Sequence, residues 1–384
     1  MIDRHTLFGP SSQLAGIPRR IGRILHAQAA RRERSVDRRH APRILAAIAS
    51  VRSDAARWVV QDSRVGEPTI LIVGPRGARS VAIVRVSRSP SGQAGLERAA
   101  AALDQLHLRL AALELAALLP VPIAHGALPG RTWLAETALE GQSARSLLPD
   151  PERRRPMLVA AAQAIGGIHA ATARPVAVDD IILDRWVTRR IRIVAESLRR
   201  GRAASRAGAE PALARVASTI AADLRDRTVS AGWIHGDLWP ANVLVTGDGA
   251  VVSGIVDWDS AEDDELALHD RLHLAVTTRR LLERRELGPV IASLLSGGSW
   301  TDDDRAVLDD APGGGTGPDA GPGDGLSGLS GLSGPGDGLS GLSDRTALWL
   351  YWLRVVESNL SRHPGLATDR TWLTANVEQV LACA

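Results

Sequence analysis

Trp233-Ile-His-Gly-Asp-Leu-Trp-Pro-Ala-Asn-Val-Leu-Val245 is the stretch that decides how this 384-residue chain is interpreted, together with Gly254-Ile-Val-Asp-Trp-Asp259. Between them, Asp248-Gly249 separates the apolar runs at residues 243–245 and 251–256. An Asp-Gly pair between two apolar runs is typical of a tight β-hairpin turn. We therefore predict a hairpin that folds back at residues 248–249.

Folding back at this turn brings Asn242, which precedes the first strand, close to Asp257, which follows the second. Oxygen ligands near substrate phosphates are typical of magnesium sites, because Mg²⁺ keeps several waters and needs few protein groups. Asp237 lies on the loop just before them, where it can orient an acceptor hydroxyl. Asp and Asn are also common turn residues with no chemical role. We favour the functional interpretation because three residues and the hairpin agree.

The segment before residue 141 has the texture of a small β-rich lobe. Short β-prone runs at residues 57–61, 69–73 and 80–86 are separated by turn residues and predict an antiparallel meander. A helical stretch at 95–118 follows, and then a strand pair that ends at 131–139. The order of three strands, one helix and two strands is compatible with such a lobe, but by itself it does not identify a fold.

The remaining segments divide the chain further. Beyond Gly141 the pattern is mainly helical, and the last helical stretch covers residues 344–381. Residues 311–342 repeat Gly-Leu-Ser with Pro and Asp, a composition that cannot build a packed core and predicts a disordered insertion, with a partner-binding tether as the alternative. Residues 1–50 are rich in Arg and Ala and are expected to form an N-terminal extension.

The motif His235-Gly236-Asp237, with Asn242 and Asp257, resembles the aminoglycoside phosphotransferase and choline kinase family. Weaker similarities extend over residues 119–123, 134–141 and 164–170, and Asp270 resembles the family's structural aspartate after the metal loop. The resemblance implies an α+β, two-lobed protein-kinase-like fold. Its nucleotide-binding N-lobe would cover residues 51–140, and its mainly helical catalytic C-lobe would cover residues 141–384.

The resemblance also implies an activity, namely ATP- and Mg²⁺-dependent transfer of the γ-phosphoryl group to a hydroxyl of a small molecule. The acceptor would be a sugar, an aminosugar, an amino alcohol or a natural-product intermediate. Asp237 would be the catalytic base or hydroxyl orienter. His235 would also belong to the catalytic residues, because it would buttress the loop. Asn242 and Asp257 would hold Mg²⁺.

The expected nucleotide-binding residues depart from the family pattern. Where the family has a lysine on the third strand, this chain has Arg85, with Glu97 as its candidate partner. A surface strand arginine and a helix glutamate would look the same in sequence. The family resemblance further suggests contacts to nucleotide from the residues Ser63 and Gly66 of a loop with a single glycine, and Glu136 and Ala138 of a hinge-like segment.

Two alternatives stay open at this point. Asp259 and the acidic residues 262–265 could attract a cationic acceptor or assist Mg²⁺, or they could be a solvated loop. The chain could also be a catalytically weak kinase-like scaffold or binding module, as Arg85 and the single-glycine loop would permit.

Composition excludes several other classes of protein. All 46 basic positions are Arg, yet the net charge is only +3 and no nucleic-acid-binding motif is present, so we expect no nucleic-acid partner. Cys383 is the only cysteine, which excludes an intrachain disulfide and favours the cytoplasm. No apolar leader or membrane span is predicted. The sequence does not determine the oligomeric state.

Overall fold

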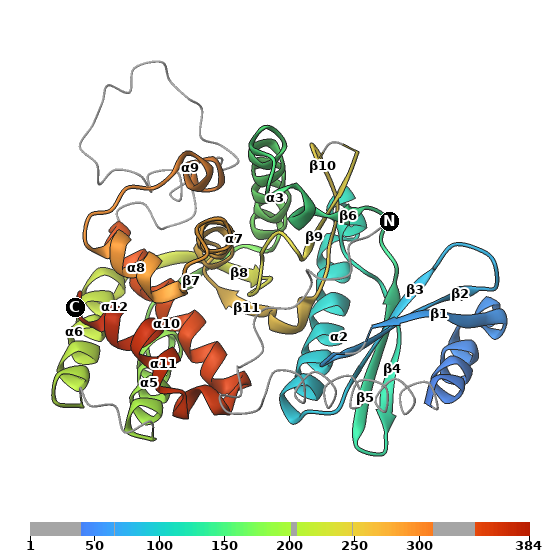
Figure 1. Cartoon of the computed structure of the whole chain (residues 1–384), viewed down its shortest axis with the longest axis horizontal. Coiled ribbons are helices and arrows are strands. Elements are labelled where there is room, and N and C mark those ends of the chain that lie inside the picture. Colours follow the sequence, from blue (N-terminus) through green and yellow to red (C-terminus); the bar gives the residue numbers. More distant parts are fainter. Residues whose placement is uncertain (1–39, 65, 201–205, 248, 310–341) are drawn as a thin grey trace, which may run out of the picture. The chain divides into compact units, whose positions relative to one another are not determined.

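The computed structural model describes residues 40–64, 66–200, 206–247, 249–309 and 342–384. Most of the expected N-terminal extension and the expected insertion at 311–342 lie outside these residues. The chain forms two compact units (Figure 1). The first contains the described residues up to Asp104 together with Pro120–Leu139, and the second contains Gln105–Leu119 and the described residues from Glu140 onwards.

The first unit contains a five-stranded antiparallel sheet with the strand order β1-β2-β3-β5-β4. Its strands are β1 (Trp58–Arg64), β2 (Thr69–Pro75), β3 (Ala82–Ser87), β4 (Pro122–Leu128) and β5 (Arg131–Thr137). All three runs of the predicted meander and the later strand pair form strands. The helix that was predicted to follow them is α2 (Pro90–Leu110).

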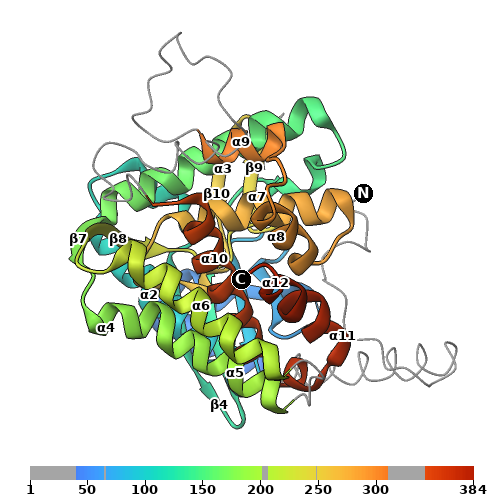
Figure 2. The same ribbon diagram turned by 90° about the vertical axis from the view of Figure 1, so that its left-hand side faces the viewer.

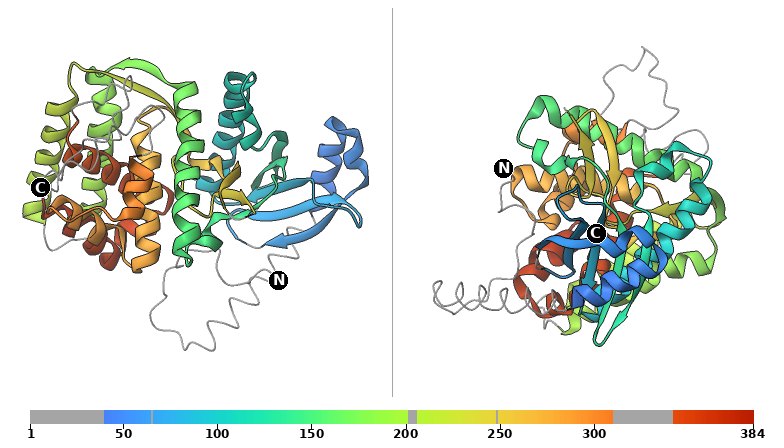
Figure 3. Two further views of the ribbon diagram at one scale, coloured as in Figure 1. Left: turned by 90° about the horizontal axis from the view of Figure 1, so that it is seen from above. Right: turned by 90° about the vertical axis from the view of Figure 1, so that its right-hand side faces the viewer.

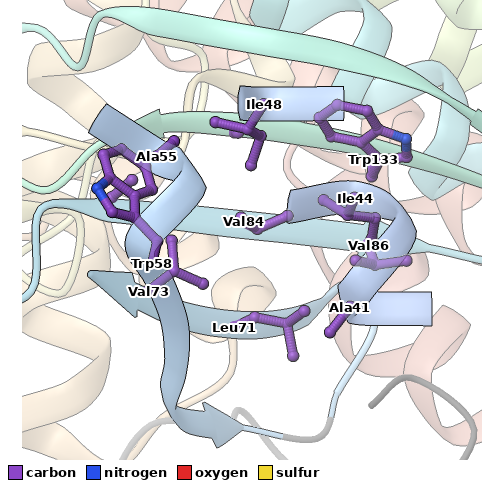
Figure 4. Close-up of a cluster of buried hydrophobic side chains, with 12 residues drawn as sticks. Ala41, Ile44, Ile48, Ala55, Trp58, Leu71, Val73, Val84, Val86 and Trp133 are labelled. Carbon is purple, nitrogen blue, oxygen red and sulfur yellow. The ribbon is translucent and has the colours of Figure 1, made fainter. Parts of the chain in front are cut away.

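One face of this sheet packs against a helix at residues 40–51, which the sequence had placed in the N-terminal extension. Ile44 and Ile48, four positions apart and so on one side of the helix, meet Leu71, Val84 and Val86 in the buried cluster of Figure 4. Both isoleucine side chains are essentially inaccessible to water. The hydrophobic core of this unit therefore begins before residue 51.

The second unit is mainly helical. Its longer helices are α3 (Pro151–Thr172), α5 (Arg189–Arg200), α6 (Arg206–Leu224), α7 (Leu268–Glu283), α8 (Leu287–Leu295) and α10 (Asp344–Arg362). Shorter helices are α4 (Asp180–Leu183), α9 (Asp302–Leu308), α11 (Arg370–Leu373) and α12 (Gln379–Leu381). Figure 2 shows α5 and α6 side by side, and α10 packs against both of them.

Two small sheets sit among these helices. One has the order β10-β9-β6 and contains β6 (Gln142–Ser143), β9 (Val243–Thr246) and β10 (Val251–Ile255). The other has the order β11-β8-β7 and contains β7 (Arg174–Ala177), β8 (Thr228–Ile234) and β11 (Glu262–Glu265). In Figure 3, α3 runs beside the β9–β10 hairpin, which it also contacts.

The helix α10 is the most deeply buried helix segment of this unit. Every residue from Thr346 to Val356 is buried, so α10 is enclosed on all of its sides. A helix that is enclosed on all sides must also bury its polar side chains, and these then need partners. Among the described residues, every helix is too short or too polar to cross a lipid bilayer.

Candidate active site

The predicted hairpin is formed by β9 and β10. Val243 pairs with Ile255, and the N–H of Val256 donates to the carbonyl of Asn242 at 2.9 Å. This last bond lies just beyond the paired strands, so Asn242 is fixed opposite the residue that precedes Asp257. The hairpin therefore brings the two expected metal ligands to one end of a rigid element.

The side chain of Asn242 is already oriented by the loop. Its Nδ2 donates to the carbonyl of Asp237 at 3.0 Å, which leaves Oδ1 as the atom suited to a cation. Asp257 has a left-handed backbone with φ of 71°, a conformation that Asp tolerates better than most residues. An amide oxygen and a carboxylate are a donor set that fits Mg²⁺, whose other ligands are usually waters and substrate phosphates. Among the described residues, no group of three His, Cys, Asp or Glu side chains forms a metal cluster of its own.

Asp237 presents a partly exposed carboxylate, with a side-chain exposure of 39%. His273 on α7 contacts its Oδ1 through Nε2 at 3.1 Å. Desolvation raises the pKa of Asp237, but the hydrogen bond from His273 and the charge of Arg362 outweigh it, so that the pKa lies below its ordinary value. Asp237 is therefore ionised at neutral pH and acts as a hydrogen-bond acceptor.

His235 is completely buried beneath this loop, and both of its ring nitrogens are used inside it. Its Nδ1 accepts the N–H of Asp237 at 3.2 Å, so Nε2 carries the proton and donates to the carbonyl of Val256 at 2.9 Å. Burial lowers the pKa of His235, which favours this neutral ring. The geometry corresponds to a support of the loop and not to a group that touches substrate.

Asp270 on α7 anchors the loop from below. Its carboxylate accepts the N–H groups of His235 at 2.7 Å and Gly236 at 2.8 Å, and contacts Nε2 of His169 at 2.9 Å. Burial raises the pKa of Asp270, but the hydrogen bond and attraction of His169, with the N–H groups, lower it to about 2. This fully buried aspartate occupies the place expected for the family's structural aspartate.

Gly236 is required at the turn between His235 and Asp237. Its φ of 80° is a left-handed conformation, and a Cβ atom there would lie 2.1 Å from the carbonyl oxygen of Ser260. Nη1 of Arg354, from α10, donates to the carbonyl of Gly236 at 3.0 Å. The loop is thus held by α7 on its N–H side and by α10 on its carbonyl side.

The acidic residues 262–265 form a strand, β11, and not a solvated loop. Their charges are compensated by arginines of the same unit: Asp263 contacts Arg109 and Arg174, Asp264 contacts Arg174 and Arg185, and Glu262 and Glu265 contact Arg190. Glu265 is completely buried. This run therefore does not provide a block of uncompensated negative charge. Asp259, the separate candidate for acceptor or metal assistance, lies on the short 3-10 turn Trp258–Ser260 directly after Asp257.

In the first unit, the expected pair of Arg85 with Glu97 is not formed. Glu97 is exposed on α2, whereas Arg85 is buried and its Nε lies 3.3 Å from Oε1 of Glu136 on β5. Leu134 is directly opposite Arg85 in the sheet, so Glu136, two positions further, is its diagonal neighbour on the same face. Arg85 pairs with Glu136 and not with Glu97 because Glu136 lies on the same face of the sheet.

The other expected nucleotide contacts are scattered over this unit. Ser63 lies in β1 opposite Leu71, and the carbonyl of Gly66 accepts the Thr69 hydroxyl at 3.2 Å in the turn before β2. The N–H of Ala138 donates to the carbonyl of Val81 at 3.1 Å just after β5. Of the predicted set, the structure brings only Arg85 and Glu136 into side-chain contact.

Sequence reasoning missed three side chains that surround the loop: His273, Tyr351 and Arg354. His273 could have been found, because it follows Asp270 by three positions on a helix and so shares its face. Tyr351 and Arg354 lie on α10, more than a hundred positions after the motif, and no local pattern connects them with it.

Comparison with known proteins identifies the family of this chain. A model of the phosphotransferase enzyme family matches residues 58–267, more than half of the chain. The chain belongs to this family. The two predictions of a kinase-like α+β fold and of an enzyme of the phosphotransferase class are thereby confirmed.

Several solved structures resemble this phosphotransferase at low sequence identity. A thermostable mutant of an aminoglycoside phosphotransferase with ADP and hygromycin B has 12% identity and a TM-score of 0.46, covering 85% of this chain and 95% of its own. Glucosamine kinase with glucosamine, ADP and inorganic phosphate has 19% identity and a TM-score of 0.46, with coverages of 88% and 85%. An aminoglycoside phosphotransferase from Streptomyces rimosus has 16% identity and a TM-score of 0.44, with coverages of 82% and 97%. No curated protein matches the sequence.

Proposed function

We propose that this phosphotransferase moves the γ-phosphoryl group of ATP to a hydroxyl of a small molecule. The observation that carries the proposal is the partly exposed, ionised carboxylate of Asp237, on a loop that Asp270 holds from below and beside the pair Asn242 and Asp257. Phosphoryl transfer of this kind depends mostly on positioning and charge neutralisation, so it needs a few well-fixed groups.

Each group has a defined part in this proposal. Asp237 accepts a hydrogen bond from the acceptor hydroxyl and takes up its proton as the acceptor oxygen bonds to the γ-phosphorus. The bond between that phosphorus and the bridging oxygen breaks, and ADP leaves. His235 and Gly236 keep the carboxylate in place through the loop backbone. Asn242 and Asp257 would hold Mg²⁺, and this ion would supply charge neutralisation at the phosphate oxygens.

We assign the nucleotide to the first unit and the chemistry to the second. Buried Arg85 with Glu136, and the β1–β2 turn that contains Gly66, are the features of the first unit that support nucleotide binding there. Because Glu136 partly compensates the charge of the Arg85 guanidinium, the electrostatic attraction of Arg85 for phosphate is weaker than that of an uncompensated cation.

The charges around the site narrow the class of acceptor. A polycationic acceptor would need a cluster of uncompensated carboxylates, but the acidic residues of β11 already have arginine partners. Arg362, whose charge acts on Asp237, adds a cation on the same side. Among sugars, aminosugars, amino alcohols and natural-product intermediates, we therefore favour an acceptor without several positive charges.

A direct test is ATP turnover by the purified chain with Mg²⁺, alone and with a panel of neutral sugars, amino alcohols and polycationic aminosugars. We expect turnover that Asp237→Asn lowers by orders of magnitude while the Kd for ATP stays within about twofold. Asp302→Asn, at an exposed aspartate of α9, is the matched control and is expected to leave turnover unchanged. Near-wild-type activity in Asp237→Asn would remove the assignment of the base.

One observation favours a second candidate, a kinase-like scaffold with weak catalysis. Arg85 pairs with Glu136 inside the first unit, so part of its positive charge is already compensated by a protein carboxylate. Calorimetric titration of ATP with Mg²⁺ separates the two candidates. A chain that binds no nucleotide, and turns over none with any acceptor of the panel, would be the scaffold.

A further inference from the structure

We propose that His273 and Tyr351 are positioning residues for the transfer, which hold Oδ1 of Asp237 so that Oδ2 receives the proton of the acceptor hydroxyl. This inference rests on the proposed function and deepens it. It starts from two contacts in series: Tyr351 Oη lies 3.2 Å from Nδ1 of His273, and Nε2 of His273 lies 3.1 Å from Oδ1 of Asp237.

The direction of both hydrogen bonds follows from the chemistry of the end group. A carboxylate can only accept, so Nε2 of His273 must carry a proton and donate to Asp237. In a neutral ring Nδ1 is then the acceptor, and the hydroxyl of Tyr351 donates to it. The Thr277 hydroxyl also lies 3.5 Å from Nε2, but at that distance it competes weakly with the carboxylate.

Burial makes the pair rigid. Tyr351 is 1% exposed on the enclosed helix α10, and the side chain of His273 is 12% exposed on α7. The two rings meet edge to face, with centroids 6.0 Å apart. Both His273 and Tyr351 are therefore fixed by packing before any substrate binds.

The helix α7 then acts on the loop at two levels. Asp270 holds the backbone N–H groups of His235 and Gly236, and His273, three positions later on the same helix, holds the side chain of Asp237. The loop backbone and the carboxylate are thus placed by one helix. Because Oδ1 is occupied by His273, Oδ2 is the oxygen left for an acceptor hydroxyl.

Tyr351 is the only tyrosine of the chain, so its hydroxyl can be removed cleanly by Tyr351→Phe. We expect His273→Ala to lower kcat for ATP turnover about tenfold, the effect of one hydrogen bond made in the transition state. His273→Gln, whose side-chain amide can donate to the same oxygen, should restore most of this loss. The KM for ATP should change less than about twofold in both variants.

Coupling between the two residues is the sharper measurement. Tyr351→Phe should lower kcat roughly threefold in the wild type and have no further effect in His273→Ala, because Tyr351 acts on Asp237 through the imidazole ring of His273. Asp302→Asn, at the exposed aspartate of α9, is the control and should leave kcat unchanged. Equal effects of Tyr351→Phe in both backgrounds, or full activity of His273→Ala, would overturn the inference.

A second readout does not depend on activity. In the nitrogen NMR spectrum of the full chain, the signals that disappear in His273→Gln should show a proton on Nε2. Tyr351→Phe should shift the Nδ1 signal of His273. A proton on Nδ1 instead would overturn the inference. If the spectrum shows the proton on Nε2 but no assay detects ATP turnover, the proposed function would be contradicted, while the hydrogen bonds of His273 to Tyr351 and Asp237 would stand.

Discussion

The carboxylate of Asp270 accepts the backbone N–H of His235 at 2.7 Å, across 35 positions of sequence and entirely out of contact with water. A second oxygen of the same carboxylate accepts the N–H of Gly236. An aspartate that receives two backbone donors and a histidine fixes the loop that carries Asp237. The candidate catalytic group is thus positioned by a residue that does not touch substrate.

We expect Asp270→Asn to lower the free energy of unfolding by about 3 to 5 kcal/mol. An amide can accept only one of the two N–H groups, and its own NH₂ would face the other. Urea titration of the wild type and the variant measures the difference. Asp302→Asn at an exposed site serves as the control and should stay within about 0.5 kcal/mol. An equal loss in both variants would contradict the anchoring role.

The same residue predicts a dependence of stability on pH. The pKa of Asp270 is about 2 in the folded chain, below its ordinary value of 3.8, so the unfolded chain takes up this proton first as the pH falls. The carboxylate contributes about 2 kcal/mol, fully present above pH 4 and lost as the pH falls through 2. Between these values the stabilities of wild type and Asp270→Asn should therefore approach each other by about 2 kcal/mol. Parallel curves over that range would contradict the assignment.

Gly236→Ala tests the close approach at the loop. The new methyl group would collide with the carbonyl of Ser260 in addition to the strain of a left-handed φ, so we expect a loss of at least about 3 kcal/mol together with lost turnover. Gly297, whose φ is 87° with open space around it, provides the matched control in the same unit. Gly297→Ala should cost about 1 kcal/mol. Chemical denaturation of Gly236→Ala and Gly297→Ala measures both losses of stability. Equal losses would show that the left-handed backbone conformation alone explains the destabilisation.

Arg85 is expected to matter for stability through Glu136. Arg85→Ala leaves a carboxylate buried without its main partner and should cost about 3 kcal/mol, and Glu136→Ala should cost a similar amount. Glu97→Ala, at the exposed residue first expected as the partner, should be silent within about 0.5 kcal/mol. Chemical denaturation of the three variants decides the matter. An effect of Glu97→Ala as large as that of Glu136→Ala would restore the original pairing.

The metal assignment predicts a difference between two neighbouring aspartates. Asp257→Asn should raise the Mg²⁺ concentration for half-maximal ATP turnover by at least about tenfold, because it removes the charged ligand beside Asn242. Asp259→Asn should raise it less than about threefold if Asp259 does no more than assist. Removal of Mg²⁺ by a chelator should abolish turnover in every variant. Unchanged Mg²⁺ dependence in Asp257→Asn would exclude Asp257 as a ligand.

The hairpin and the convergence at its end were predictable from local sequence patterns. Asp248-Gly249 between two apolar runs predicted where the chain reverses. The exact register was not predictable, because a register shift between Val252 and Gly254 places Asn242 opposite Val256. The meander of the first unit was readable for the same reason as the hairpin turn. Alternating burial and turn residues are local signals, and a local signal needs no knowledge of the rest of the chain.

The pairing of charged groups, in contrast, depends on long-range packing. Many carboxylates are chemically equal partners for Arg85, and the choice of Glu136 depends on which strand lies beside β3. The role of the acidic run at 262–265 stayed open in the sequence, because its compensating arginines come from distant segments. Tyr351 and Arg354 reach the catalytic loop because α10 is enclosed in the second unit. Such contacts depend on long-range packing, which selects partners by proximity and not by pattern.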